Sequence, residues 1–115
     1  VQREFDPVKK TFVVDGFVTP EAKQGAVWID QDRVLIATDW GGDGSTLTES
    51  GYPSSVRLWR RGQPLDEAQE LLSVDRTHIG AWPWMQELQD GGVIYGAVDS
   101  DTFYTGGRAW RVRWF

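Results

Sequence analysis

The sequence contains no cysteine and only one histidine, His78, and each scarcity excludes a class of chemistry. Without cysteine there are no disulfide frameworks and no thiolate metal sites, although the redox compartment stays open. A single imidazole argues against a triad, a histidine relay or a multi-histidine metal site within one chain. No apolar run approaches the ~20 residues that cross a bilayer, and no signal peptide is recognisable. We therefore expect no cofactor, no metal site and no membrane partner.

The composition favours a single β-rich unit. The 115 residues include 40% hydrophobic residues and 25% charged residues, with a formal net charge of −5. A chain of this size can build one modest core and no more. Seven Trp and 13 Gly suit pleated, half-buried strands joined by many turns. We expect helix to be scarce.

Short runs suited to strands recur about every ten residues, which is typical of meandering antiparallel sheet. Alternating apolar residues make the pair 26–30 and 33–39, joined by Gln31-Asp32, the surest hairpin. One helical turn is predicted over 65–69, after Pro64. The full set of predicted strands is 1–5, 11–14, 26–30, 33–39, 55–61, 70–74, 79–85, 92–98, 102–105 and 108–114.

The spacing of these strands predicts an all-β fold made of about two four-stranded blades of a β-propeller. Residues 26–75 hold one complete blade, 1–25 the end of a preceding one, and 76–115 a following blade that need not be complete. In that last blade the expected turns are Asp99-Ser100-Asp101 and Gly106-Gly107. The chain starts at Val1 and ends in the strand-like, apolar residues Trp114 and Phe115, so we expect it to be a piece of a longer protein.

Residues 39–68 carry the most specific sequence pattern. "LTESGYP" at Leu47 to Pro53 and "VRLWRRGQPLDEA" at Val56 to Ala68 resemble a long ungapped signature of the N-terminal β-propeller in a bacterial branch of the prolyl oligopeptidase family of serine peptidases. The resemblance covers about Arg3 to Asp75 through the flanking segments "REFD", "GFVTPEAK" and "VWIDQDRVLIATDWG". The tail, 76–115, fits a propeller by strand pattern alone.

The resemblance implies a two-domain enzyme. Its α/β-hydrolase domain carries a Ser-Asp-His triad, and a seven-bladed propeller limits access to short, proline-containing peptides. This chain would be a non-catalytic part of the propeller, with the hydrolase domain of the same parent chain and the peptide substrate of the full enzyme as partners. Its compartment is not assigned, and the bacterial cytoplasm and the periplasm both stay open. The sequence supports a non-catalytic role independently of the resemblance, because it contains no G-x-S-x-G nucleophile elbow. The nearest string, 42–46, lacks the final glycine, so we assign no catalytic residue.

Two groups of charged residues receive structural interpretations. Asp30, Asp32, Asp99 and Asp101 lie at predicted hairpin turns, where carboxylates hydrogen-bond their own backbone. Arginines interleave with Trp59 and Trp110, a pattern that nucleic-acid binding could also use. The net charge opposes that use, so we expect ion pairs between strands and no nucleic-acid partner. The arginines concerned are Arg57, Arg60, Arg61, Arg108, Arg111 and Arg113.

Aromatic residues leave a second function open. Trp82-Pro83-Trp84 could form a sugar-binding platform, so the alternative is a stand-alone module that binds glycans or a protein partner. The default is burial of most tryptophans between blades. We expect Ser50 to Pro53 to shape a turn, since Gly51 permits a backbone conformation that other residues resist and Pro53 fixes φ. Substrate-binding residues are not assigned. An isolated piece of propeller would expose apolar faces, so we also expect it to self-associate.

Overall fold

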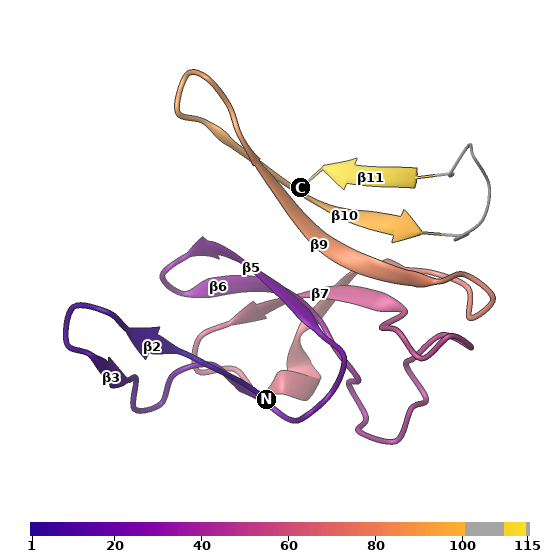
Figure 1. Ribbon diagram of the computed structural model, residues 1–115, viewed down its shortest axis with the longest axis horizontal. Coiled ribbons are helices and arrows are strands. Elements are labelled where there is room, and N and C mark those ends of the chain that lie inside the picture. The colour runs from indigo at the N-terminus through magenta and orange to yellow at the C-terminus, as the bar shows by residue number, and fades with distance from the viewer. Residues whose placement is uncertain (101–109, 115) are drawn as a thin grey trace.

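The described part of the chain folds mainly from antiparallel strands (Figure 1). The structure, a computed structural model, describes residues 1–100 and the backbone of Trp110–Trp114. Two sheets stack on each other, and a pair of two-stranded ribbons leads into them from the N-terminus. The all-β class predicted from composition and spacing is confirmed.

The first sheet is a four-stranded meander that matches the predicted blade. Its strands pair in chain order and antiparallel throughout. Each begins and ends within about two residues of the prediction, because alternating apolar residues and short turns encode local pairing. The predicted helical turn is present as a 3-10 helix, η1 (Leu65–Glu67). The strands are β5 (Gly25–Asp30), β6 (Arg33–Ala37), β7 (Ser55–Arg60) and β8 (Gln69–Ser73).

The second sheet has the order β11-β10-β9 and corrects one prediction. Its strands are β9 (Gly80–Glu87), β10 (Val93–Ser100) and β11 (Trp110–Trp114). The turn predicted at Asp99-Ser100 is wrong, because both residues are buried and continue β10 in register with β9 and β11. The predicted strand 102–105, Asp101 and the Gly106-Gly107 turn lie outside the described residues.

The N-terminal segment, residues 1–19, departs from the two strands, 1–5 and 11–14, that we predicted. Its first strand breaks at Glu4 into β1 (Gln2–Arg3) and β2 (Phe5–Asp6). Strand β2 pairs with β3 (Thr11–Phe12) as expected, whereas β1 pairs with β4 (Val18–Thr19), a strand that we did not predict. The pairing of β1 with β4 joins residues far apart in sequence, which a local pattern does not reveal.

Strand β6 is buried on both faces and divides the apolar interior into two clusters. The first cluster lies between the two sheets, and the second lies between the first sheet and the N-terminal segment. Successive β6 residues alternate between them, as the pleat requires. The first cluster comprises Leu35, Ala37, Val56, Leu58, Leu72, Ala81 and Ala97. The second comprises Phe17, Val34, Ile36, Trp59 and Ala68.

Candidate functional site

The signature loop, residues 39–54, fastens the first sheet to the second. Thr48 Oγ1 donates a buried hydrogen bond of 2.7 Å to the carbonyl of Ile79, and Ala81 N donates to the carbonyl of Pro53 at 2.8 Å. Gly51 has φ of +84°, and Pro53 is fully buried. The ring of Tyr52 meets Trp82 edge-on at 5.4 Å. These contacts agree with the architectural role expected for this stretch.

Residues 42–46 form a hydrogen-bonded turn within that loop. The Asp39 carboxylate accepts from Gly44 N at 3.1 and 3.3 Å and from Thr46 Oγ1 at 3.4 Å. Ser45 is exposed, and its backbone N–H donates to Asp43 Oδ1 at 2.9 Å. Hydrogen bonds from Ser45 lower the pKa of Asp43. The one histidine in the sequence, the usual base for a serine nucleophile, contacts Asp99 instead.

His78 takes part in a different contact. Its Nδ1 lies 2.7 Å from Oδ1 of Asp99, whose side chain is 8% exposed. The contact supplies a partner for a carboxylate on a buried strand, where an unpaired charge is costly. The structural role predicted for His78 therefore fits its surroundings, and Asp99 has this role in place of the predicted turn chemistry.

A cluster of charges centred on Arg61 joins the N-terminal segment to the first sheet. Arg61 donates to both carboxylate oxygens of Glu4 at 2.8 Å, and its Nε lies 3.1 Å from Oδ1 of Asp32. Glu4 also accepts from Phe17 N at 3.0 Å, and the guanidinium lies over the Phe17 ring, 4.9 Å from its centroid. Bidentate arginine–carboxylate pairs fix geometry as well as charge.

The contacts in this cluster favour the charged forms of both Glu4 and Arg61. The Arg61 hydrogen bonds lower the pKa of Glu4, although partial burial opposes them, and the same pair raises the pKa of Arg61. The Glu4 side chain is only 12% exposed, so it is less screened than an ordinary surface carboxylate. The ion pairing expected for Arg61 is therefore present, but its partner Glu4 was not predicted, because the two residues lie 57 positions apart.

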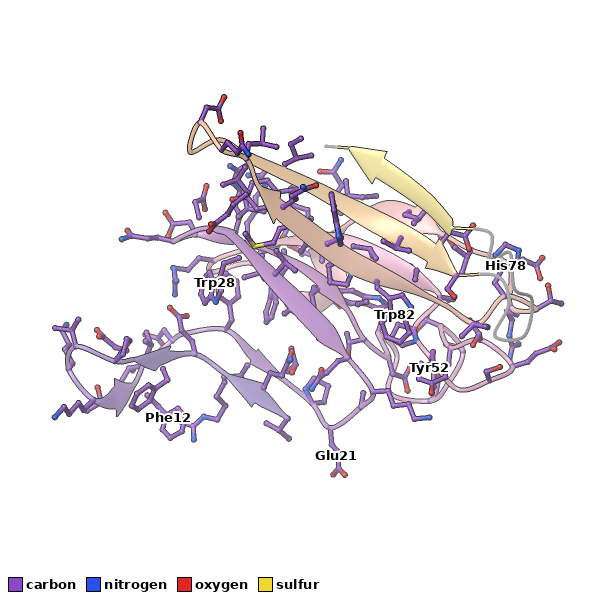
Figure 2. The ribbon with its side chains drawn as sticks, turned by 45° about the horizontal axis from the view of Figure 1, so that its top comes forward. Phe12, Glu21, Trp28, Tyr52, His78 and Trp82 are labelled. Carbon is purple, nitrogen blue, oxygen red and sulfur yellow. The ribbon has the colours of Figure 1, made fainter. Side chains whose placement is uncertain are left out.

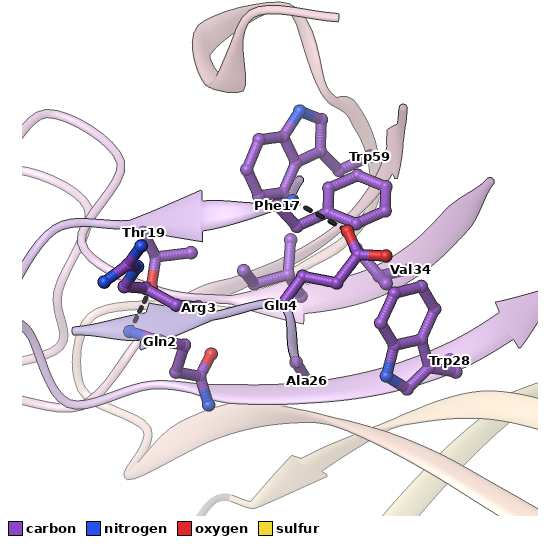
Figure 3. A pocket seen from close by; sticks show the side chains of 10 residues that line it. Gln2, Arg3, Glu4, Phe17, Thr19, Ala26, Trp28, Val34 and Trp59 are labelled. Atoms are coloured by element: carbon purple, nitrogen blue, oxygen red, sulfur yellow. Dashed lines mark hydrogen bonds between the residues drawn. The ribbon is translucent and has the colours of Figure 1, made fainter. Parts of the chain in front are cut away.

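Beside this Arg61 cluster, a cavity of about 350 Å³ separates the N-terminal segment from the first sheet (Figure 3). Its floor is the sheet face that we call the open face, formed there by Ala26, Trp28, Val34, Ile36 and Trp59. Its roof includes Gln2, Arg3, Glu4, Phe17 and Thr19. The open face is incompletely covered, because Trp28 is 48% exposed even though Phe17 packs edge-on against both indoles.

The tryptophans are less buried than predicted. Among those whose side chains the structure describes, Trp59 is buried, with its Nε1 donating to the carbonyl of Gln63 at 2.7 Å. Trp40, Trp82 and Trp84 are half-buried, and Trp28 is exposed. The expectation that most of them fill layers between sheets is wrong for the described residues, because only one face of the first sheet meets a complete neighbouring layer.

The other charged residues singled out in the sequence lie in turns or on strands. Asp30 Oδ1 accepts from Asp32 N at 2.9 Å, and the other oxygen pairs with Arg33, so turn chemistry at this hairpin agrees with the prediction. Arg57 lies over the Trp40 ring, 4.5 Å from its centroid. Within the described residues, His, Cys, Asp and Glu form no group of three or more that could hold a metal ion. No helix in that part of the chain is long and apolar enough to cross a membrane.

Comparison with known proteins finds two similar peptidases and one solved enzyme of similar structure. The chain is 34% identical over 106 residues to an uncharacterised peptidase, y4nA, of Sinorhizobium fredii, and 28% identical over 113 residues to an uncharacterised peptidase, RP174, of Rickettsia prowazekii. These matches cover 92% and 89% of this chain. A solved post-proline cleaving enzyme from Rickettsia typhi superposes over 96% of this chain with a TM-score of 0.64 at 23% identity. The resemblance to a segment of prolyl oligopeptidase-family peptidases is confirmed.

The chain covers only a small part of each protein that it matches. It spans 14% and 15% of the two curated peptidases and 18% of the solved chain. No family model matches it. The structural likeness shows that the fold is shared.

Proposed function

We propose that this chain is a non-catalytic part of the β-propeller of a prolyl oligopeptidase-like serine peptidase, where it helps to gate substrate access and docks on the hydrolase domain. The observation that supports the proposal most directly is the match to 14% of a longer peptidase over 92% of this chain. In this assignment 1–25 ends one blade, 26–75 is a complete blade, and 76–115 belongs to the next. The full-length enzyme hydrolyses short proline-containing peptides.

The fold supports the proposal through its sheet arrangement. A four-stranded meander, β5 to β8, stacks face to face on a second antiparallel sheet, and β6 is buried on both sides. Sheets stacked in series are the building plan of a propeller. The sequence has no G-x-S-x-G string, and its one histidine pairs with Asp99, so the chemistry is assigned to another part of the parent protein.

Two measurements test the proposal. The longer reading frame should encode a hydrolase domain with a G-x-S-x-G elbow, and that full protein should cleave a proline-containing chromogenic peptide. The 115-residue chain alone should give no turnover. Hydrolysis by this chain that is abolished by Ser45→Ala, or a reading frame without a hydrolase domain, overturns the proposal.

A glycan-binding module is the second candidate, and the 48% exposure of Trp28 beside the cavity is the observation that favours it. Half-exposed indoles can stack on sugar rings. Titration of tryptophan fluorescence with a panel of oligosaccharides separates the two functions. A saturable blue shift at micromolar sugar, lost in Trp28→Ala, supports the module and counts against the propeller assignment.

A further inference from the structure

We propose that Arg57 and Trp40 form a binding site for a carboxylate, with the guanidinium as the charged donor and the indole N–H as a second donor. Each residue carries an N–H group that has no acceptor within the described residues. The class of ligand follows from these donors alone. The proposal therefore goes beyond the proposed function and does not depend on it.

Packing, and not an ion pair, holds Arg57 in place. Its neighbours on β7, Val56 and Leu58, belong to the cluster between the sheets, so Arg57 projects from the other side of the strand. There its guanidinium lies over the Trp40 ring, with Cζ 4.5 Å from the ring centroid. Trp40 in turn packs against the second apolar cluster. Stacking of this kind orients the guanidinium but provides no acceptor for its N–H groups.

Two N–H groups of this stack lack acceptors. Nε of Arg57 and Nε1 of Trp40 are shielded from solvent, and neither makes a hydrogen bond within the described residues. Because Nε1 belongs to the indole that the guanidinium covers, the two donors are neighbours. Buried donors without acceptors are costly, and native proteins contain few of them. The stack is thus prepared for an acceptor that the described part of the chain does not supply.

The positive charge of Arg57 also lacks a counter-ion. Glu70 lies opposite Arg57 on β8, but its side chain is exposed and the two residues form no ion pair. The Nη1 and Nη2 atoms of Arg57 are unpaired as well, and unlike Nε they are not shielded from solvent. An anion in solution can therefore approach the guanidinium at this accessible edge.

A carboxylate fits these donors better than other acceptors do. It accepts two parallel hydrogen bonds from a guanidinium and compensates its charge, which a carbonyl oxygen cannot do. Its oxygens have further lone pairs, so one of them can also accept from the indole N–H after a small rotation of the stack. The net charge of −5 and the neighbouring Glu70 oppose a phosphate dianion more strongly than a monovalent carboxylate.

Two sources of a carboxylate share this chemistry, the free C-terminus of a peptide and an acidic side chain. Acetyl-glycyl-proline represents the first source, and the α-amide of N-acetyl-aspartic acid represents the second. Acetyl-glycyl-prolinamide lacks the carboxylate and is otherwise the same molecule as the first probe. Comparison of the two acids shows which source the site prefers.

Nuclear magnetic resonance of the indole N–H groups in the ¹⁵N-labelled chain tests the site. Trp40→Phe keeps an aromatic ring under the guanidinium and identifies the Trp40 signal by its loss. Titration with acetyl-glycyl-proline to ~10 mM, enough to saturate a site with a Kd of about 1 mM, should move that signal downfield to a plateau. The prolinamide should leave it in place. Sodium chloride and sodium phosphate at the same ionic strength should shift it less than the acid does.

Variants of two arginines on one strand separate a specific site from general attraction of anions. Arg57→Gln should abolish the saturable shift. Arg57→Lys keeps the charge but loses the planar fork, so binding should weaken about tenfold, the effect of losing one hydrogen bond to a charged group. Arg60→Gln removes the same charge from an exposed position on β7 and should bind like the unmodified chain. Near-ultraviolet circular dichroism reports whether each variant is folded, and Arg57→Lys serves as the test if Arg57→Gln unfolds.

Four outcomes overturn the proposal. The first is a Trp40 signal that shows no saturable shift with either acid. The second is an equal shift with the prolinamide, chloride or phosphate. The third is unchanged affinity in folded Arg57→Gln or, if that variant unfolds, in Arg57→Lys. The fourth is an equal loss of binding in Arg60→Gln, which would assign the effect to net charge.

Discussion

Glu4 and Arg61 show how single residues set the position of a whole segment. The carboxylate accepts two hydrogen bonds from the guanidinium and one from Phe17 N, and a Cβ at Gly16 would come within 2.8 Å of it. Residue 16 therefore has to be small for the pair to form. At this one point the N-terminal segment is held by an ion pair with Arg61, by a hydrogen bond from Phe17 N, and by close packing of Glu4 on Gly16.

We expect the free energy of unfolding to decrease in acid because of Glu4. Its folded pKa lies below the ordinary value of 4.5, so its contribution is complete above that value and is lost as the pH falls through the folded pKa. Glu4→Gln should cost about 1–3 kcal/mol at pH 7 and flatten the acid dependence of denaturant midpoints. Glu21→Gln, an exposed loop control (Figure 2), should leave both unchanged. Equal acid profiles for the two variants would contradict this role.

Gly51 carries a second residue-scale prediction. Its φ of +84° is a conformation that β-branched residues resist, and the nearest atom to a Cβ there is Lys23 Nζ at 3.9 Å. The cost of substitution should therefore come from the backbone and not from a clash. Gly51→Val should destabilise by about 1–3 kcal/mol, whereas Gly51→Asn should cost less, since asparagine tolerates this region. Denaturant melts compare the two, and equal losses would assign the effect to the side chain.

At the scale of elements, local pairing could be predicted and distant pairing could not. The β5–β8 meander follows from alternating apolar residues and short turns, within one blade's length of sequence. By contrast, β4 pairs with β1 across 17 residues, from Gln2 to Thr19. Asp99 resembled a turn residue because it stands in an Asp-Ser-Asp run, but burial beside His78 places it in β10. The sequence predicted ion pairs for Arg61 but did not indicate Glu4 as its partner, because the two residues lie 57 positions apart.

Trp59 and Trp28 lie on neighbouring parts of one sheet face and should respond differently to truncation. Trp59 is 6% exposed and anchors Phe17, whereas Trp28 is 48% exposed. Trp59→Ala should lower the free energy of unfolding by ~3 to 5 kcal/mol. Trp28→Ala should cost far less, because much of its ring already contacts water. Denaturant melts at micromolar concentration, where association is weak, make the comparison, and a larger loss for Trp28→Ala would contradict the burial pattern.

On the scale of the whole molecule, the two sheets share one buried cluster. Leu35 and Val56 of the first sheet are fully buried against Ala81 and Ala97 of the second. Tyr95 Oη of β10 also donates to the carbonyl of Ile29 in β5 at 2.9 Å. Neither sheet can bury this cluster alone, so both should lose their structure together.

Leu35→Ala tests that cooperativity. Leu35 is 0% exposed, and its truncation should lower the free energy of unfolding by about 2–5 kcal/mol. Because the side chain serves both sheets, the midpoints by tryptophan fluorescence and by far-ultraviolet circular dichroism should move together. Met85→Ala, at a position on β9 that is 40% exposed, is the matched control and should shift neither midpoint by more than about 0.5 kcal/mol in free energy. Two separate transitions in Leu35→Ala, one for each sheet, would show that the sheets are stable apart and that their stacking is incidental.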